Sequence, residues 1–200
     1  MARLDLFGRY KRKIWQELCD RIDADFFKHR FQSKDRIEAY YKNWIITIDK
    51  FIVDKIIFTR IRAPFVNRDD FKFKLVREYK AHRISKFLGM QDVIVGYPDF
   101  DKSYIIQGSD ERKLNMLFSN PDIRQLISYQ SKIHLELKHD NGWFKKKYPE
   151  GINELYFHVS GVLKDIDQLH DLYDLFAITL DHLCHIGTAY EDDPRFTHYE

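Results

Sequence analysis

Apolar and polar residues alternate along several separate stretches of this sequence, and this feature constrains the fold most. In residues 36–42, Ile37, Ala39 and Tyr41 alternate with charged residues and a second tyrosine. Successive side chains of a β-strand point to opposite faces of a sheet, so each such stretch predicts a strand with one apolar and one polar face. The stretches that predict strands are residues 36–42, 44–49, 55–62, 71–75, 92–95, 104–106, 133–138 and 155–160.

The connections between these stretches predict how the strands pair. The first four stretches follow one another through short polar turns, so we expect an antiparallel meander with one face toward solvent. The third strand should end before Pro64, because proline has no N–H to donate to a strand ladder. The last two stretches predict a hairpin whose loop, residues 139–151, is longer than usual.

Two long segments repeat their apolar residues at helical spacing instead. Residues 6–23 and 165–186 each present a wide apolar stripe. Gly187 follows the second segment, where a left-handed residue commonly ends a helix. Shorter helices are expected at residues 81–88, from the cap Ser109 onward, and from Asn120–Pro121 onward.

Strands in runs and helices in runs predict an α+β protein rather than a parallel α/β protein. We expect a single domain over residues 1–200, with an N-terminal helix and lead-in at 1–30 and an acidic tail at 190–200. Its mainly antiparallel sheet, in one piece or split in two, should be covered by the N-terminal helix and the long C-terminal helix.

The charge and the cysteine content of the chain argue against several classes of function. Lys and Arg number 33 and Asp and Glu 31, a net charge of +2, which argues against specific nucleic-acid binding. The two cysteines cannot form a disulfide framework or a four-cysteine zinc site. No stretch approaches the roughly 20 apolar residues of a transmembrane helix, and the charged N-terminus does not resemble a secretory signal. We therefore expect a cytoplasmic protein whose cysteines remain thiols.

From Trp44 onward the sequence contains a set of distinctive short segments, among them Gly96, Pro98 and Phe100–Asp101. Through these segments about three quarters of the chain resembles a family of uncharacterised bacterial proteins, a domain of unknown function. Because no activity is known for this family, the resemblance implies a family and no chemistry. The other segments that carry the resemblance are residues 59–65, 88–92, 117–121, 142–144, 149–151, 154–157, 183–187 and 189–194.

The familiar catalytic motifs are absent from the sequence: it has no nucleophile elbow, phosphate loop, dinucleotide fingerprint or zinc-protease motif. His182, Cys184 and His185 lie close together near the end of the last helix, but they do not share one face of it. We favour an ion pair between Asp181 and His185 over a metal site, and we expect neither a metal nor a cofactor.

The long loop holds one group of candidate binding residues, Trp143 and the run Lys145, Lys146 and Lys147. Aromatic residues beside lysines are found on proteins that bind anionic membranes or single-stranded nucleic acid. The simpler interpretation, which we favour, has the aromatic rings packed on the domain and the lysines in water. The basic N-terminal helix has the same two interpretations, and we expect it to cover the sheet.

The second group of candidates is Arg60, Arg62, Asp99 and Asp101. The two arginines lie on one side of a strand, and if Ile56 on that side faces the core they should sit at its rim. We expect them to pair with Asp99 and Asp101; the alternative is a site for an anion or a substrate.

The sequence therefore favours a non-enzymatic binding or accessory module that recognises a protein partner or an anionic group. The first alternative is an enzyme of unfamiliar type, with a cleft near Arg60, Arg62, Asp99 and Asp101. The second is a protein of the membrane surface that binds through its first helix or the lysine loop.

Overall fold

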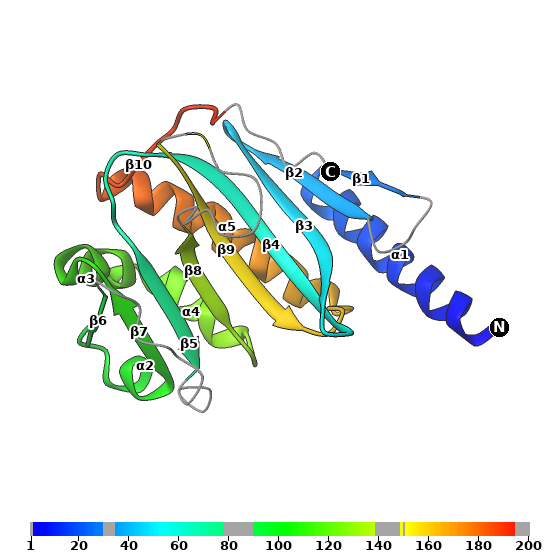
Figure 1. Cartoon of the computed structure of the whole chain (residues 1–200), viewed down its shortest axis with the longest axis horizontal. Helices are drawn as coiled ribbons and strands as arrows, with labels where there is room; N and C mark the ends of the chain where they lie inside the picture. Colours follow the sequence, from blue (N-terminus) through cyan, green and yellow to red (C-terminus); the bar gives the residue numbers. More distant parts are fainter. Residues whose placement is uncertain (1, 30–34, 78–89, 139–148, 150, 195–200) are drawn as a thin grey trace.

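The computed structural model describes residues 2–29, 35–77, 90–138, 149 and 151–194, and for residues 2–11 the backbone alone. The described chain forms one large antiparallel sheet with five helices, which confirms the α+β class (Figure 1). The elements are α1 (Ala2–Ile22), β1 (Ala24–Phe27), β2 (Arg36–Tyr41), β3 (Trp44–Val53), β4 (Ile56–Asn67), β5 (Phe73–Arg77), β6 (Gln91–Asp92), α2 (Pro98–Ser103), β7 (Tyr104–Gly108), α3 (Glu111–Ser119), α4 (Pro121–Tyr129), β8 (His134–Lys138), β9 (Ile152–Ser160), α5 (Ile166–His185) and β10 (Ala189–Tyr190).

The strand order is β1-β2-β3-β4-β9-β8-β5-β7-β6, with β10 beside the far end of β4. The sheet is in one piece. The expected four-strand meander is wrong at its last step, because the β8–β9 hairpin lies between β4 and β5. Nine register pairs, from Phe58 with Ser160 to Val66 with Ile152, bind β9 along β4. This long match leaves no place for β5 beside β4.

Pro64 lies inside β4, opposite Glu154, so the expected end of this strand before proline is also wrong. The carbonyl of Ile57 and the N–H of Asn67 both bond toward β9, to Gly161 and Gly151. Backbone groups of consecutive residues point to opposite sides of a strand, and Pro64 is an odd number of residues from both Ile57 and Asn67, so its nitrogen faces away from β9. On that side β3 pairs with β4 only up to Arg62. The missing N–H of Pro64 therefore costs no ladder bond.

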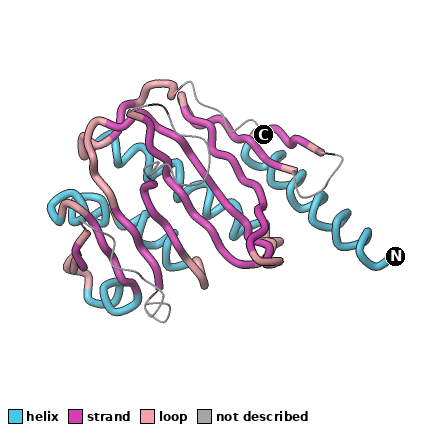
Figure 2. Tube along the Cα trace, viewed as in Figure 1, coloured by secondary structure: helices cyan, strands magenta, loops and turns pink. Residues whose placement is uncertain are grey.

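Helices cover one face of the sheet, as expected. In Figure 1, α4 and α5 lie behind the strands, and α1 runs along β1 and β2; Figure 2 shows the same layers in cyan and magenta. Asp165 caps α5, and Gly187 follows it with a φ of +74°. The buried face of the sheet and the helices share one apolar core, which includes Trp15, Leu18, Trp44, Ile61, Phe73, Leu135, Phe157, Leu172 and Phe176.

The shorter helices correct some local expectations. Asp110, rather than Ser109, caps α3 by accepting the N–H of Lys113 at 3.0 Å, while the Ser109 hydroxyl accepts the N–H of Lys72. Asn120 caps α4 as predicted. The helix expected at residues 81–88 lies outside the described residues. No helix of the described chain is long and apolar enough to cross a bilayer.

Candidate functional site

The face of the sheet opposite α4 and α5 is polar. One register row crosses it through Glu38, Thr47, Arg62, Tyr156, Glu136, Lys74 and Gln107. This row and its neighbours between β3 and β5 are called the polar face below. Most of its side chains are buried; Arg62, for example, is 8% exposed. Charged side chains are seldom buried to this extent unless they are paired.

Two arginines of the polar face share one carboxylate. Arg60 donates from Nε and Nη2 to the two oxygens of Asp49 at 2.7 and 2.6 Å, and Arg62 donates from Nη2 to Asp49 Oδ2 at 2.7 Å. We call these three residues the arginine clasp. Asp49 lies directly opposite Arg60 in the β3–β4 register, so the alternation of the strands brings the three side chains together.

The expected pairing of these arginines with Asp99 and Asp101 is wrong. Asp101 accepts the backbone N–H groups of Val95 and Tyr97, both at 2.9 Å, and Asp99 is exposed in the first turn of α2. The strands β9, β8 and β5 separate β4 from β7, which follows α2. The four residues are therefore not brought together in one cleft.

A cross-strand pair of histidines lies beside the arginine clasp. The rings of His134 and His158 are 4.2 Å apart, and His134 Nε2 is 3.2 Å from Glu136 Oε2. Burial alone would raise the pKa of Glu136, but the contact with His134 and the charges of Lys138 and Lys74 lower this pKa to about 2. Burial, and then the neighbouring His134, lower the pKa of His158 to about 3.

Some buried polar atoms of this face have no hydrogen-bond partner among the described residues. They include Arg62 Nε and His158 Nδ1. Burying such a group without a partner costs about 1–3 kcal/mol on scales drawn from protein variants. The polar face is therefore tightly paired in most places and unsatisfied at a few.

The β3–β4 hairpin ends in an apolar projection. Ile52, Val53, Ile56 and Ile57 are 56%, 48%, 52% and 42% exposed, and we call these four residues the hairpin tip. Consecutive residues point to opposite faces, so the tip is apolar on both. The described pairing of β2 with β3 stops at Ile48, and that of β9 with β4 at Phe58. The tip is thus a two-stranded ribbon beyond the sheet.

The turn at the end of this ribbon is strained. Asp54 and Lys55 have φ values of +49° and +66°, the left-handed region in which Asn and Gly are preferred for a two-residue hairpin turn. The short turn fixes the register of Val53 opposite Ile56 and of Ile52 opposite Ile57. It therefore fixes which of the four aliphatic side chains lie opposite one another.

Two stacked phenylalanines connect the tip to the polar face. The rings of Phe51 and Phe58 are 5.0 Å apart, and both meet the edge of the His158 ring. The Arg60 guanidinium lies over Phe51 at 5.0 Å. Ile56 shares the side of β4 that bears Phe58 and the arginines, as expected, but this side is the polar face and not the core.

The sequence interpretation missed the hairpin tip, although it contains a signal. Residues 52–57 read Ile-Val-Asp-Lys-Ile-Ile, so apolar residues occupy consecutive positions on both sides of a polar pair. Such a break in the alternation, centred on a two-residue turn, indicates a ribbon that is apolar on both faces. The Asp-Lys pair concealed the turn because it lacks the usual glycine.

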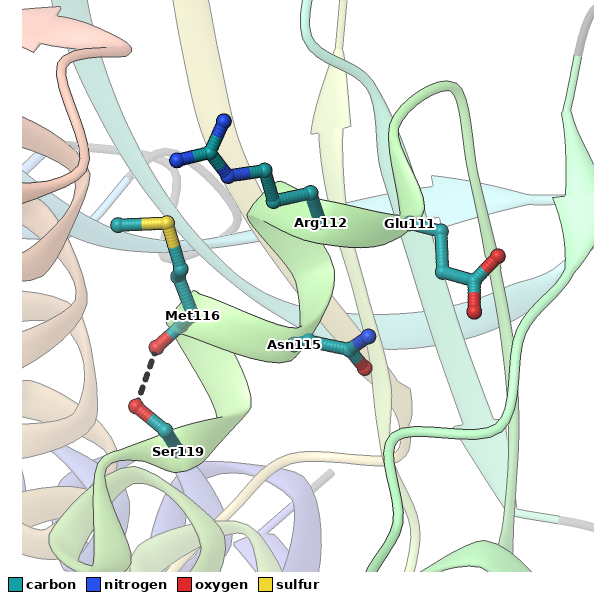
Figure 3. A pocket seen from close by; sticks show the side chains of 5 residues that line it. All are labelled: Glu111, Arg112, Asn115, Met116 and Ser119. Carbon is teal, nitrogen blue, oxygen red and sulfur yellow. Dashed lines mark hydrogen bonds between the residues drawn. The ribbon is translucent and has the colours of Figure 1, made fainter.

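A shallow pocket on α3 has no convergent chemistry. Figure 3 shows the Arg112 and Met116 side chains on one side of the helix and Glu111 and Asn115 on the other. The Ser119 hydroxyl donates to the Met116 carbonyl at 2.7 Å, so it is engaged. A ligand or catalytic site requires side chains that point to a common centre, which these do not.

At the end of α5, Asp181 does not pair with His185, contrary to expectation. It accepts the Tyr41 hydroxyl at 2.6 Å and Lys42 Nζ at 2.7 Å, because the β2–β3 turn packs against this end of the helix. His182 contacts the Met116 carbonyl.

Within the described ranges, no three His, Cys, Asp or Glu side chains are grouped to hold a metal. Trp143, Lys145, Lys146 and Lys147 lie outside the described residues.

Comparisons with known proteins give a fold and no family. No protein-family model and no curated protein matches the chain, which is consistent with its resemblance to proteins of unknown function. The crystal structure of the mycobacterial trehalose monomycolate transport factor A, TtfA, is similar, with a TM-score of 0.52. The match covers 88% of this chain and 93% of that one at 10% identity. At this identity the likeness shows the fold alone.

Proposed function

We propose that the chain is a cytoplasmic accessory module, without catalytic activity, that binds a protein partner through the hairpin tip. The proposal rests on the exposure of four aliphatic side chains on a two-stranded ribbon. Burying an Ile or Val side chain fully contributes about 1.5–3 kcal/mol, and at the tip much of this contribution is left unused. Grouped exposed apolar residues are typical of interaction sites.

A protein partner fits the ribbon better than a lipid bilayer. The backbone N–H and C=O of Ile52 point away from β4, toward the side on which β2 lies. The described pairing of β2 with β3 has already ended there, at Ile48. In hydrocarbon an unpaired N–H or C=O costs several kcal/mol, about 2–7 by transfer, so an open strand edge is excluded from the membrane interior. A protein can offer both an apolar groove and backbone partners.

Two titratable groups of the polar face, Glu136 and His158, are poorly suited to acid–base catalysis. A general acid or base works best with a pKa near the working pH. Glu136, with a pKa of about 2, and His158, with a pKa of about 3, are both far from neutrality. The pairing of Asp49 with both arginines further supports a structural role for this face. TtfA is named as a transport factor, and an accessory role for this chain is compatible with that name.

Photo-cross-linking in the native cells tests this proposal. A benzophenone amino acid at Val53 should give a discrete cross-linked protein product. The same probe at Ile94, which is 75% exposed on another part of the surface, serves as the matched control. Combining Ile52→Thr and Ile57→Thr should abolish the product from position 53 without changing the melting temperature. Identical products from both positions, or none from position 53, would contradict the proposal.

The loop residues Trp143, Lys145, Lys146 and Lys147 remain a proposed second contact for an anionic partner. If they contribute, changing the three lysines to glutamine should weaken the cross-link from position 53 and should make the remaining product less sensitive to salt than that of the wild type.

A further inference from the structure

We infer that the hairpin tip and the arginine clasp form one docking surface, which takes an acidic, aliphatic-rich segment of a partner protein. This inference rests on the proposed function and adds the chemistry of the partner. Arg60 and Arg62, which the sequence singled out as residues for a partner or an anion, thereby join the tip in one site.

The two parts are continuous on one side of the β3–β4 pair. Val53 and Ile56 are register partners at the tip, Phe51 and Phe58 follow them, and Asp49 with Arg60 comes next. The Arg60 side chain is 23% exposed and lies over the Phe51 ring. A bound extended segment that covers the tip and continues along β4 would therefore pass from aliphatic contacts to a guanidinium.

The charges along this path favour a negative partner. Asp49 Oδ2 accepts from both arginines, and Arg62 Nε is buried without a partner in the described part of the chain. Between β3 and β5 the polar face has more cationic than anionic side chains. The cations are Arg60, Arg62, Lys138 and Lys74, and the carboxylates are Asp49, Glu136 and Glu154.

The position of this excess matters more than its size. Glu136 lies within 4 Å of His134 and Lys138, and Glu154 is the register partner of Lys138. The clasp, next to the tip, has two guanidiniums that share one carboxylate. A partly buried guanidinium forms stronger pairs with carboxylates than one in water, because the lower dielectric screens the charges less.

The test uses three short fluorescein-labelled peptides with the full chain. They alternate Val with Asp, with Asn or with Lys, so that only the charge differs. Fluorescence anisotropy should show the Val/Asp peptide bound about tenfold more tightly than the Val/Asn peptide, and the Val/Lys peptide more weakly than either. Raising the salt to about 0.5 M should remove most of this preference, since the charges are partly exposed.

Variants assign the preference to the named residues. Arg60→Gln should reduce the affinity for the Val/Asp peptide toward that for Val/Asn. The combination of Val53→Thr and Ile56→Thr, on the same side of the β3–β4 pair as Arg60, should weaken binding of both peptides. Ile94→Thr, on a distant surface, should change neither. If Arg60→Gln lowers the melting temperature, Lys55→Gln at the exposed turn replaces it and should give a smaller loss in the same direction.

Each contrary outcome has a distinct meaning. Equal affinities for the Val/Asp and Val/Asn peptides would overturn the acidic chemistry and leave docking at the tip intact. No binding of any peptide at about 1 mM, with no cross-link from position 53, would overturn the inference and the proposed function together. Flotation with phosphatidylglycerol vesicles that is lost in the tip variant, without peptide binding, would assign the surface to membranes and overturn the inference.

Discussion

In most proteins apolar side chains are buried and charged side chains are exposed, and the hairpin tip and the polar face depart from this rule in opposite ways. The tip exposes aliphatic side chains, whereas the polar face, a few residues further along the same two strands, buries charged ones. The charged residues tolerate burial because Arg60 and Arg62 both donate to the Asp49 carboxylate. The aliphatic residues of the tip have no comparable compensation within the described chain. The contrast teaches that contacts within the fold account for most of the buried charge, whereas no contact within the described chain accounts for the exposed aliphatic side chains.

The apolar core beneath the polar face should give the largest loss in the free energy of unfolding. Phe157 is fully buried in β9 on the apolar side of the sheet. Phe157→Ala should lower the free energy of unfolding by about 3–5 kcal/mol, because it removes a large ring from a close-packed core. Urea melts should measure this loss, with Tyr129→Ala, at a side chain 53% exposed, as the control. A loss at Phe157 no larger than the control would show that the core is placed incorrectly.

Removing the shared carboxylate should be the next largest effect. Asp49→Ala leaves two guanidiniums without their anion, one of them in a buried position, and should cost about 3 kcal/mol. Asp99→Ala, at the residue that the sequence wrongly assigned to the arginines, should change the free energy of unfolding by less than about 0.5 kcal/mol. A larger loss for Asp99→Ala than for Asp49→Ala would support the pairing of Asp99 with the arginines and contradict the arginine clasp.

Acidification should weaken the polar face. The folded pKa of His158, about 3, lies below its unfolded value near 6.5, so its contribution is complete above pH 6.5 and is lost as the pH falls toward 3. Between pH 7 and pH 5 this group should account for about 2 kcal/mol of lost stability. Glu136, lowered to about 2, should add a loss only below about pH 4.5.

Urea melts of the wild type and of His158→Gln at both pH values isolate this contribution. The variant should lose about 2 kcal/mol less than the wild type between pH 7 and pH 5. Equal losses would mean that His158 takes up its proton as readily in the folded as in the unfolded protein.

Substitutions in the strained turn at Asp54 and Lys55 should increase the free energy of unfolding, by less than the losses above. Asp54→Asn combined with Lys55→Gly supplies the residues that a left-handed two-residue turn prefers, and should stabilise the protein by about 1 kcal/mol. Thermal melts measure the gain, and the cross-link from position 53 should persist. A loss of stability would mean that the Asp54 and Lys55 side chains make contacts that outweigh their backbone strain.

The tip itself should give the smallest effect on folding. Ile52→Thr with Ile57→Thr keeps β-branched residues and should change the free energy of unfolding by no more than about 0.5 kcal/mol. The contrast with Asp49→Ala separates a binding residue from a folding residue. A loss above about 2 kcal/mol would place these side chains in the core and remove the case for a partner.

Alternation in the sequence predicted most of the strands and which residues face the core, since period two is a local property of each segment. It did not predict that β9 lies between β4 and β5, because strand order depends on contacts between residues far apart in the chain. The partner of Arg60 was within reach of local reasoning. A turn at Asp54–Lys55 places Asp49 opposite Arg60 by register, but without glycine the turn was not recognised. Distant carboxylates at 99 and 101 were chosen instead.

Pro64 has a consequence for the behaviour of the chain while it folds. Along one edge of β4, pairing with β3 reaches Arg62 and pairing with β10 begins at Val66. Hairpin partners can join within microseconds, roughly 1–10, but β10 must return from far along the chain, so the end of this edge of β4 stays open for longer. Between the two pairings, proline offers no donor to a stray strand. The same residue that is harmless in the finished sheet thus protects the nascent sheet against self-association.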